Sequence, residues 1–259
     1  ALCLRDRNEG FECFLIHASN FASFAQELSI KACFFAPAAG CNLLPIVNPR
    51  PTMKLLRIDA SARLDGSHSR DLGDHFCAAL RDAVPNLDIT VRDLATKPTE
   101  LIQDTTIVGF YTPGDEMTSA MRQATALSDQ LIDELQAADT LLLTVPMYNF
   151  SIPAALKAWI DQVVRINHTF SYNGTAFTGL VKARQAYVVC AYGAAGYAPG
   201  EGFEAANFLQ PYMQFLLQFL GIDSIDFAAV QATTADEQTV ATNTTTAKAQ
   251  IDQWVMRYA

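Results

Sequence analysis

The sequence predicts an α/β fold in which helices cover both faces of a doubly wound, five-stranded parallel sheet. From residue 53 onward, short apolar runs alternate with longer segments of helical periodicity, and this alternation is typical of parallel strands joined by crossover helices. The run at the centre, residues 140–146, is apolar without a polar face, which favours a strand covered on both sides. Half of the 259 residues are hydrophobic, so the chain can fill such a core.

The five expected strands share short runs of aliphatic and β-branched residues, and they span residues 54–60, 88–94, 140–146, 185–190 and 224–230. The second alternates in polarity and is expected to be half-buried or at an edge. Helices are expected between the strands, where apolar residues recur at helical spacing. They cover about residues 71–83, 121–138, 154–164 and 208–220, and a last helix carries Ile251, Trp254, Val255 and Tyr258. Five strands in this pattern fit the flavodoxin-like order.

Two connections stand out by length or turn chemistry. Residues 95–118 contain Pro98, Pro113 and Gly114 and show no clear period, so we expect a long loop with a functional role. Residues 170–179 contain the dipeptide Asn173-Gly174, which predicts a tight turn in a small hairpin.

The chain divides into two parts at a proline-rich stretch that ends at Pro51. Residues 1–52 lack a clear period, and we interpret them as an N-terminal extension that is not native to the protein, with Met53 as the working start. The alternative is an accessory segment that packs on the domain. The acidic residues Asp6, Glu9 and Glu12 do not suit a secretory signal. Residues 53–259 form the predicted domain.

Charge and cysteine content exclude several classes of function. The formal net charge of -9 argues against nucleic acid or an anionic membrane as partner, because both attract clustered Lys and Arg. No stretch approaches the roughly 18 apolar residues of a membrane span, so a cytoplasmic protein is expected. Cys77 and Cys190 match no CxxC metal pattern, and we interpret them as reduced structural thiols. No metal site is predicted.

The loop after the central strand is the first candidate for a binding site. Pro146 cannot donate a ladder hydrogen bond, so the strand should end there. Ser151 is a plausible N-cap for the next helix, with Pro153 in its first turn. Met147 to Phe150 therefore lie at the carboxyl end of a central parallel strand, where open α/β sheets bind ligands. Their aromatic and amide groups suit a flat heteroaromatic molecule with a polar edge.

A second candidate is the polar loop after the first strand, residues 61–70. Its hydroxyls, on Ser61, Ser67 and Ser69, precede a helix N-terminus, and hydroxyl donors with a helix dipole form a phosphate cradle. The loop has neither the GxxxxGK nor the GxGxxG pattern. The plainer alternative is a serine-rich helix cap. The loop after the fourth strand contains Gly193 and Gly196, where backbone can approach a ring closely.

Residues 53 to about 258 resemble the FMN-dependent NADH:quinone oxidoreductases and azoreductases of bacteria, which have a flavodoxin-like fold. The matching segments are the first strand ending in Ser61, the triplet SHS at residues 67–69, PMYNFSIP with the following LKAWID, TFSY at 169–172, GLV at 179–181 and FLGI at 219–222. Among these, the PMYNF loop is the most specific.

The resemblance implies a noncovalent FMN, one per subunit, and NADH or NADPH as electron donor. It places the phosphate on Ser61, Ser67, His68 and Ser69. The flavin ring would lie against Met147, Tyr148, Asn149 and Phe150, and against Ala191, Tyr192, Gly193 and Ala194. This last segment often reads SRGG in relatives and reads AYGA here, so an Arg and a Ser side chain are absent.

The resemblance also implies a homodimer with two sites at the subunit interface and a substrate pocket lined by Tyr172 and Phe150. The expected reaction is two-electron reduction of quinones and aromatic azo compounds, by ping-pong hydride transfer through flavin N5, with no catalytic side chain.

Two other functions compete with this one. A serine hydrolase would use Ser61 or Ser67 as nucleophile and His68 or His168 as base, but the GxSxG elbow is absent from the sequence. A flavodoxin-type electron carrier needs no substrate pocket, whereas the long loop at 95–118 and the hairpin suggest one.

Overall fold

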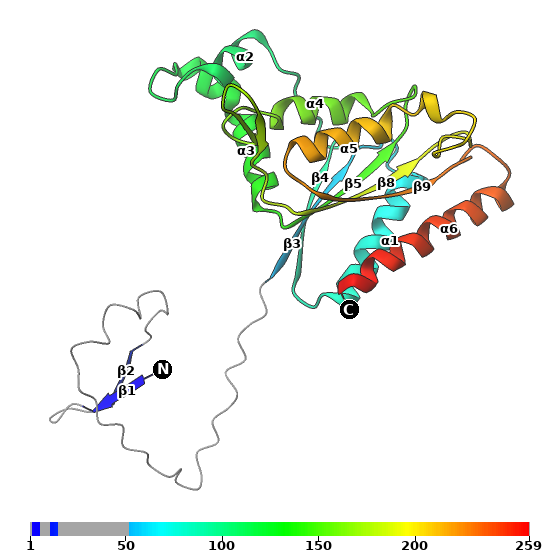
Figure 1. Ribbon diagram of the computed structural model, residues 1–259, viewed down its shortest axis with the longest axis horizontal. Coiled ribbons are helices and arrows are strands. Elements are labelled where there is room, and N and C mark those ends of the chain that lie inside the picture. Colours follow the sequence, from blue (N-terminus) through cyan, green and yellow to red (C-terminus); the bar gives the residue numbers. More distant parts are fainter. Residues whose placement is uncertain (1, 6–10, 15–51, 259) are drawn as a thin grey trace, which may run out of the picture. The chain divides into compact units, whose positions relative to one another are not determined.

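A computed structural model describes residues 2–5, 11–14 and 52–258 of the protein (Figure 1). The chain forms two compact units, Ala1–Asn48 and Pro49–Ala259. In the first unit, β1 (Leu2–Arg5) pairs antiparallel with β2 (Phe11–Phe14). Apart from these strands, the predicted N-terminal extension lies outside the described residues, so its status stays a prediction.

The second unit is built on one parallel sheet, as the sequence predicts. The strand order is β4-β3-β5-β8-β9, and each neighbouring pair is parallel. The strands are β3 (Met53–Asp59), β4 (Leu87–Asp93), β5 (Thr140–Pro146), β8 (Gln185–Ala191) and β9 (Ser224–Val230). Counted along the chain, this is the flavodoxin-like order 2-1-3-4-5. The alternating strand β4 lies at an edge, as expected.

Helices cover both faces of this sheet (Figure 1). One face carries α1 (His68–Ala83) and α6 (Glu237–Val255), and the other carries α3 (Ser119–Ala137), α4 (Ala154–Val163) and α5 (Leu209–Phe219). Short 3₁₀ turns follow at η2 (Glu204–Ala206) and η3 (Met256–Tyr258). None of the described helices has the length and apolar character needed to cross a bilayer.

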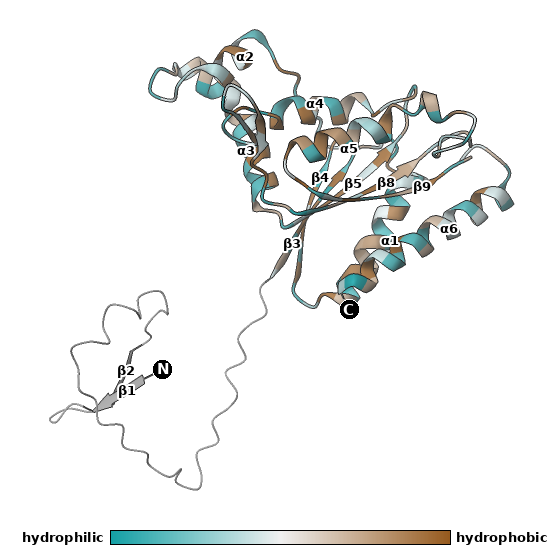
Figure 2. Cartoon of the chain, in the orientation of Figure 1, coloured by the Kyte–Doolittle hydropathy of each residue, from teal (hydrophilic) through white to brown (hydrophobic). Residues whose placement is uncertain are grey.

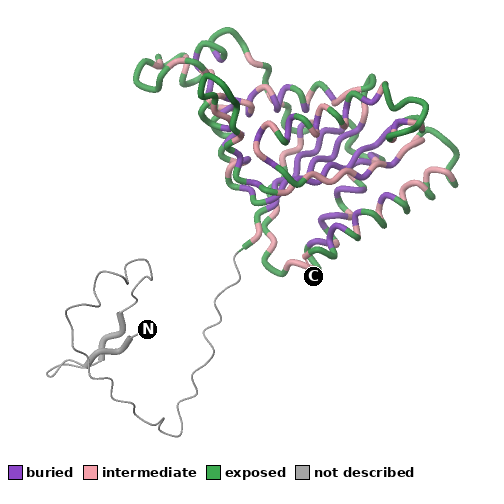
Figure 3. The backbone as a smooth tube through the Cα atoms, in the orientation of Figure 1, coloured by how far each residue is buried: buried purple, intermediate pink, exposed green. Residues whose placement is uncertain are grey.

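The core has two layers because neighbouring residues of a strand point to opposite faces. In β5, Leu141 and Leu143 pack with α3, α4 and α5, whereas Leu142 packs with α1 and α6. All three side chains are at most 1% exposed, and burying each stabilises the fold by roughly 2 kcal/mol. Figure 2 shows the hydrophobic central strands, and Figure 3 shows that they are buried. This double cover fixes the carboxyl ends of the strands, where the loops meet.

Two elements differ from the prediction. The expected loop at 95–118 contains a helix, α2 (Asp104–Tyr111), which was missed because it is short and rich in β-branched residues of low helix propensity. The N-cap of α4 is Pro153 and not Ser151, and no side chain caps it. Ser151 instead pairs its backbone with Tyr148.

The predicted hairpin is present as β6 (Phe170–Tyr172) and β7 (Phe177–Gly179). The Asn173 carboxamide oxygen accepts hydrogen bonds from the N–H groups of Thr175 and Ala176 within the turn. Where β7 ends, Gly179 lies against Gly221 just after α5. A Cβ added to Gly179 would come within 2.2 Å of the Gly221 nitrogen. Backbone therefore touches backbone, and the hairpin is seated on the end of α5.

Candidate functional site

The loops that follow β3, β5, β8 and β9 enclose a cavity of about 310 Å³ at the carboxyl edge of the sheet, within the size range of ligand sites. The predicted residues that line it are Ser61, Ser67, His68, Ser69, Met147, Tyr148, Ala191 and Gly193. The structure thus brings the three predicted loops together. It adds five residues that the sequence reasoning missed, namely Arg63, Gly66, Pro146, Thr233 and Thr234.

The first wall of the cavity is the N-terminus of α1, which begins at His68 and not after Arg70 as predicted. It begins earlier because Ser67 is the N-cap, and its Oγ accepts the Arg70 N–H at 3.5 Å. The Ser67 and Ser69 hydroxyls lie 3.4 Å apart. The first-turn N–H groups of His68 and Ser69 have no partner within the helix. Two hydroxyls and these N–H groups therefore form an anion site.

Ser61 lies opposite this helix end, and it is 2% exposed. Its Oγ accepts the Arg63 N–H at 3.2 Å, so its own hydroxyl proton stays available to a ligand. The next N–H group, of Ala62, donates to the Tyr148 hydroxyl at 3.2 Å. Tyr148 therefore ties the loop after β3 to the loop after β5.

Arg70 holds the loop after β3 in place through hydrogen bonds of its guanidinium. Its guanidinium donates to the Ser61 carbonyl at 2.8 Å, to both carboxylate oxygens of Asp93 at 2.8 and 2.9 Å, and to Asp59 at 3.3 Å. Hydrogen bonds from Arg70 are the main cause that lowers the pKa of Asp93 to about 2. One side chain thus joins the ends of β3 and β4 to the first turn of α1.

A second buried arginine, Arg57, belongs to the same network of charged residues, because it also donates to Asp59. Arg57 donates to Asp59 at 2.9 Å and to Asp74 at 2.5 Å, while Thr144 donates to Asp59 at 2.8 Å. Arg57 and Asp59 are both less than 10% exposed, so each needs the other's charge. Arg63 differs, because it lines the cavity and no carboxylate among the described residues pairs with it.

The second wall is a tight turn directly after β5. Tyr148 and Ser151 exchange two backbone hydrogen bonds, at 3.0 and 3.2 Å, around Asn149 and Phe150, whose φ angles are 48° and 71°. Two positive φ values in a row are typical of a type I′ turn, which prefers Asn-Gly. Phe150 occupies the position that glycine prefers in this turn, and its positive φ strains the backbone. Its side chain is 53% exposed. Neither turn-centre residue is among those that line the 310 Å³ cavity.

The third wall is the loop after β8, where the structure corrects part of the prediction. Ala191 and Gly193 line the cavity, but Tyr192 and Ala194 do not. Tyr192 is 2% exposed and its ring packs in the core, 5.4 Å from that of Tyr197. Strand alternation explains this, because Ala191 and Tyr192 point to opposite sides. Burial raises the pKa of the Tyr192 phenol.

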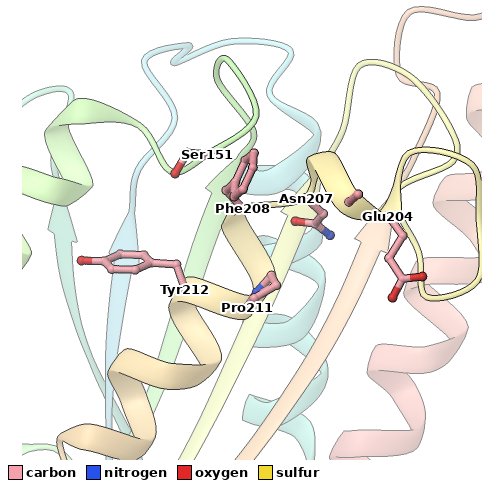
Figure 4. Close-up of a pocket in the computed structure, with 7 residues that line it drawn as sticks. Ser151, Glu204, Asn207, Phe208, Pro211 and Tyr212 are labelled. Carbon is pink, nitrogen blue, oxygen red and sulfur yellow. The ribbon is translucent and has the colours of Figure 1, made fainter.

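A larger hollow of about 750 Å³ lies on the far side of the turn at 148–151 (Figure 4). Its wall is Ser151 together with residues of η2 and the start of α5, among them Asn207, Phe208 and Tyr212. The Phe208 N–H donates to the Phe150 carbonyl at 3.0 Å, so the strained turn is braced from this side.

Tyr172, predicted to line the substrate pocket, lines neither hollow in this chain. It is 47% exposed, its ring centroid is 4.6 Å from that of Phe177, and its hydroxyl donates to the Gly174 carbonyl.

The geometry does not support the hydrolase alternative. Among the described residues, no hydrogen bond joins a serine hydroxyl of the cavity to a histidine ring. His168 does not line the cavity, and burial lowers its pKa. Cys190 is 1% exposed, and burial raises its pKa to about 12, so it is an inert thiol. The described residues hold no cluster of three metal-ligating side chains.

The donor set of the 310 Å³ cavity fits a phosphate ester of a flat ring. Neutral hydroxyls and helix N–H groups lie at the β3 end, where φ is 64° at Gly66 and a Cβ there would meet no atom within 4 Å. Met147, Tyr148 and backbone from Ala191 to Gly193 lie towards the β8 end. The two halves of an FMN molecule differ in the same way.

Comparisons with known proteins agree with this arrangement. A family model described as "Flavodoxin-like fold" matches residues 53–255. The chain is 52% identical over 172 residues to an FMN-dependent NADH:quinone oxidoreductase of Xanthobacter autotrophicus, covering 66% of this chain and 83% of that protein. It is 39% identical over 191 residues to FMN-dependent NADH:quinone oxidoreductase 1 of Hahella chejuensis, covering 74% and 91%. An FMN-dependent NADH-azoreductase of Bacillus anthracis, solved with FMN, superposes with a TM-score of 0.71 at 24% identity, covering 80% and 99%.

Proposed function

Because the chain belongs to the family with the flavodoxin-like fold, we propose that it is an FMN-dependent oxidoreductase that reduces quinones and aromatic azo compounds with NADH or NADPH. The observation that carries the proposal is the cavity at the carboxyl edge of the sheet, where a hydroxyl-rich helix end meets an aromatic turn. The relatives at 52% and 39% identity are named FMN-dependent NADH:quinone oxidoreductases, which supports the flavin, the NADH and the quinone of this proposal.

The loop after β3 would hold the FMN phosphate. Ser61, Ser67 and Ser69 supply hydroxyls, His68 and Ser69 supply N–H groups, and the α1 dipole favours the negative charge. Arg57 and Arg70 are already paired with carboxylates. They therefore stabilise the conformation of the loop through these ion pairs. Arg63 lines the cavity and pairs with no carboxylate in the described part of the chain, so its charge would partly neutralise the phosphate.

The other loops would hold the flavin ring. Met147 and Tyr148 provide apolar surface, and Ala191 and Gly193 let backbone approach closely. The N–H groups of Met147 and Tyr148 already donate to the carbonyls of Ala191 and Ser151. The donors left at the turn are therefore those of Asn149 and Phe150. Neither residue lines the 310 Å³ cavity, so these N–H groups would stabilise negative charge on the reduced ring only where the ring extends past Tyr148 towards the turn.

When bound, FMN would supply the hydride chemistry by which two electrons pass from the nicotinamide to the acceptor. The protein contributes binding, orientation and electrostatics, and no side chain has to act as acid or base. Donor and acceptor would use the same open side of the cavity in turn, as a ping-pong reaction requires. We also propose a cytoplasmic location for the protein.

A homodimer would complete the substrate pocket. Tyr172 lies away from the cavity of its own chain, so the pocket would be closed by Tyr172 of the partner subunit over Phe150. Large apolar side chains on α2 and α5 are exposed in the single chain, among them Tyr111 at 74% and Phe215 at 66%, and they border a groove lined by Ile107, Phe110 and Phe219. Such a surface is typical of a subunit contact.

The test is a visible absorption spectrum of the purified protein, recorded before and after anaerobic NADH and again after a benzoquinone is added. We expect a flavin spectrum that bleaches with NADH and returns with the quinone. A protein that stays colourless and binds no added FMN would refute the proposal. Sedimentation at several concentrations tests the dimer separately.

A further inference from the structure

We propose that the loop after β9 is a fourth part of the FMN site, in which Thr233 contacts the polar edge of the flavin ring and Thr234 positions Gly193. This inference rests on the proposed function and assigns roles to two residues for which neither the sequence motifs nor the family resemblance accounts. Both line the 310 Å³ cavity together with residues from the three predicted loops.

The first observation is the pairing of this loop with the loop after β8. The N–H groups of Ala232, Thr233 and Thr234 donate in succession to the carbonyls of Ala194, Tyr192 and Gly193, at 3.1, 3.1 and 3.2 Å. The Thr234 hydroxyl donates to the Gly193 carbonyl as well, at 2.9 Å. The two loops therefore continue the contact of β8 with β9 beyond the sheet, and the backbone that faces the ring cannot move independently of residues 232–234.

The second observation is that the two threonines use their hydroxyls differently. The Thr234 hydroxyl is committed to Gly193. The Thr233 hydroxyl has no hydrogen-bond partner among the described residues, although Thr233 is half-buried and lines the cavity. A hydroxyl both donates and accepts, and at a half-buried position on the cavity wall it can bond a ligand in place of water. It is therefore placed to bond a ligand.

The third observation is strain in the same loop. Ala232 has φ of 56°, a left-handed conformation that disfavours a residue with a Cβ by about 1 kcal/mol. Of the four non-glycine residues with positive φ in the described chain, Asn149, Phe150 and Ala232 lie in loops at this edge of the sheet. Strained backbone gathers at binding sites because the surrounding contacts hold it in place.

Sheet order indicates which part of the ligand Thr233 meets. The phosphate cradle follows β3, and β9 lies three strands further along the order β3-β5-β8-β9. At about 4.8 Å per strand this is roughly 14 Å, comparable with the length of FMN from its phosphate to the far edge of its ring. That edge carries alternating C=O and N–H groups, which suit a hydroxyl. Thr233 would supply a side-chain hydrogen bond that the AYGA segment does not.

The experiment compares FMN with riboflavin, which has the same ring and no phosphate. Apoprotein is titrated with each flavin and binding is followed by flavin fluorescence, for the wild type and for Thr233→Val, Thr234→Val and Ser67→Ala. We expect Thr233→Val to weaken both flavins by the same factor of about 3 to 10. Ser67→Ala should weaken FMN alone, and Thr234→Val should weaken both about 2- to 5-fold and change the visible circular dichroism of the bound flavin.

Two further variants serve as controls. Thr233→Ser should restore binding because it keeps the hydroxyl. Thr245→Val changes an exposed threonine on α6 whose hydroxyl donates to the Ala241 carbonyl, and it should leave both affinities as in the wild type. Midpoint potentials give an independent readout, since loss of a donor to the ring should make the potential of Thr233→Val more negative.

Three results would overturn the assignment, provided that the wild type binds FMN. They are unchanged affinity in Thr233→Val or unchanged dichroism in Thr234→Val, a loss in Thr233→Val that affects FMN but spares riboflavin, and failure of Thr233→Ser to restore binding. If the wild type itself binds no flavin, the proposed function fails, and this outcome is separate from the other three.

Discussion

The two ends of the cavity are held in place by different interactions. At the β3 end, Arg57 and Arg70 are paired with carboxylates under the loop that carries Ser61. At the β8 end, the loops are held mainly by backbone hydrogen bonds and a strained turn, to which the Thr234 hydroxyl adds one side-chain hydrogen bond to the Gly193 carbonyl. The first end therefore depends on particular side chains and on pH. The second depends mainly on backbone and should tolerate exchange of side chains in the AYGA segment at residues 191–194.

The largest effect on stability should come from removing the positive charge of Arg70, which lies at the centre of the β3 end. Arg70→Ala leaves Asp59 and Asp93 without their shared partner and releases the Ser61 carbonyl. Breaking a largely buried pair costs about 3 kcal/mol, so we expect that loss in urea denaturation and a markedly weaker FMN affinity. Arg70→Lys should recover only part of it, because an ammonium cannot bind Asp93 with two parallel hydrogen bonds. Full stability in Arg70→Ala would mean that these ion pairs do not hold the β3 end.

Acid should weaken the same end first. Arg70 lowers the pKa of Asp93 to about 2 in the folded protein, against about 4 in an unfolded chain. A lowered carboxylate pKa stabilises the fold above pH 4, and this contribution disappears as the pH falls from about 4 to about 2. Asp93→Asn should flatten the pH dependence of the unfolding free energy in that window. If Asp93→Asn and the wild type have parallel profiles, the ion pair contributes nothing.

At the β8 end, relief of the backbone strain at Phe150 should raise the stability of the protein and lower its activity. Phe150→Gly removes a side chain from a position with φ of 71°, and glycine adopts that conformation without a Cβ penalty. We expect the midpoint of thermal unfolding to rise, with a gain of about 1 kcal/mol. The kcat/KM for a quinone should fall about tenfold, because the aromatic surface of the turn is lost. A variant that is destabilised would contradict the turn assignment.

The smallest effect is expected from restoring a relative's side chain at the backbone-held end. Ala191→Ser introduces the first residue of SRGG into a loop whose position is set by hydrogen bonds to β9 and its loop. We expect the FMN dissociation constant, measured by fluorescence titration, to change by at most about threefold, the value of one exposed hydrogen bond. A change of a hundredfold would mean that side chains and not backbone define this end.

Much of the fold could be predicted from the sequence because its signals are local. The strands at 140–146 and 224–230 and the turn at Asn173-Gly174 were predicted within a residue, since each depends on a run of neighbouring residues. The α2 helix was missed because Thr105, Thr106 and Ile107 favour strands. Ser151 suits an N-cap by type, but the turn before α4 takes its backbone instead.

For the site, the sequence could identify loops but not the network beneath them. Arg70, Asp59 and Asp93 come together only through the register of β3 with β4, in which Asp59 is opposite Asp93. That register is a property of the folded sheet. Tyr192 is predicted as a site residue because it belongs to the segment at residues 191–194. Alternation at the end of β8 instead directs its side chain away from the cavity and into the core. Thr233 and Thr234 belong to no motif, and their one available signal was their position after a parallel strand.

The contact between Gly179 and Gly221 limits how this protein can diversify. A Cβ added to Gly179 would lie 2.2 Å from the Gly221 nitrogen, and Gly221 has φ of 95°, where a side chain is strained, so both positions favour glycine and hold the hairpin in place. Tyr172 and Phe177, at the exposed end of the same hairpin, have no such restriction. Under the proposed function, exchange of Tyr172 or Phe177 should therefore change acceptor preference with less loss of folded protein than exchange of either glycine.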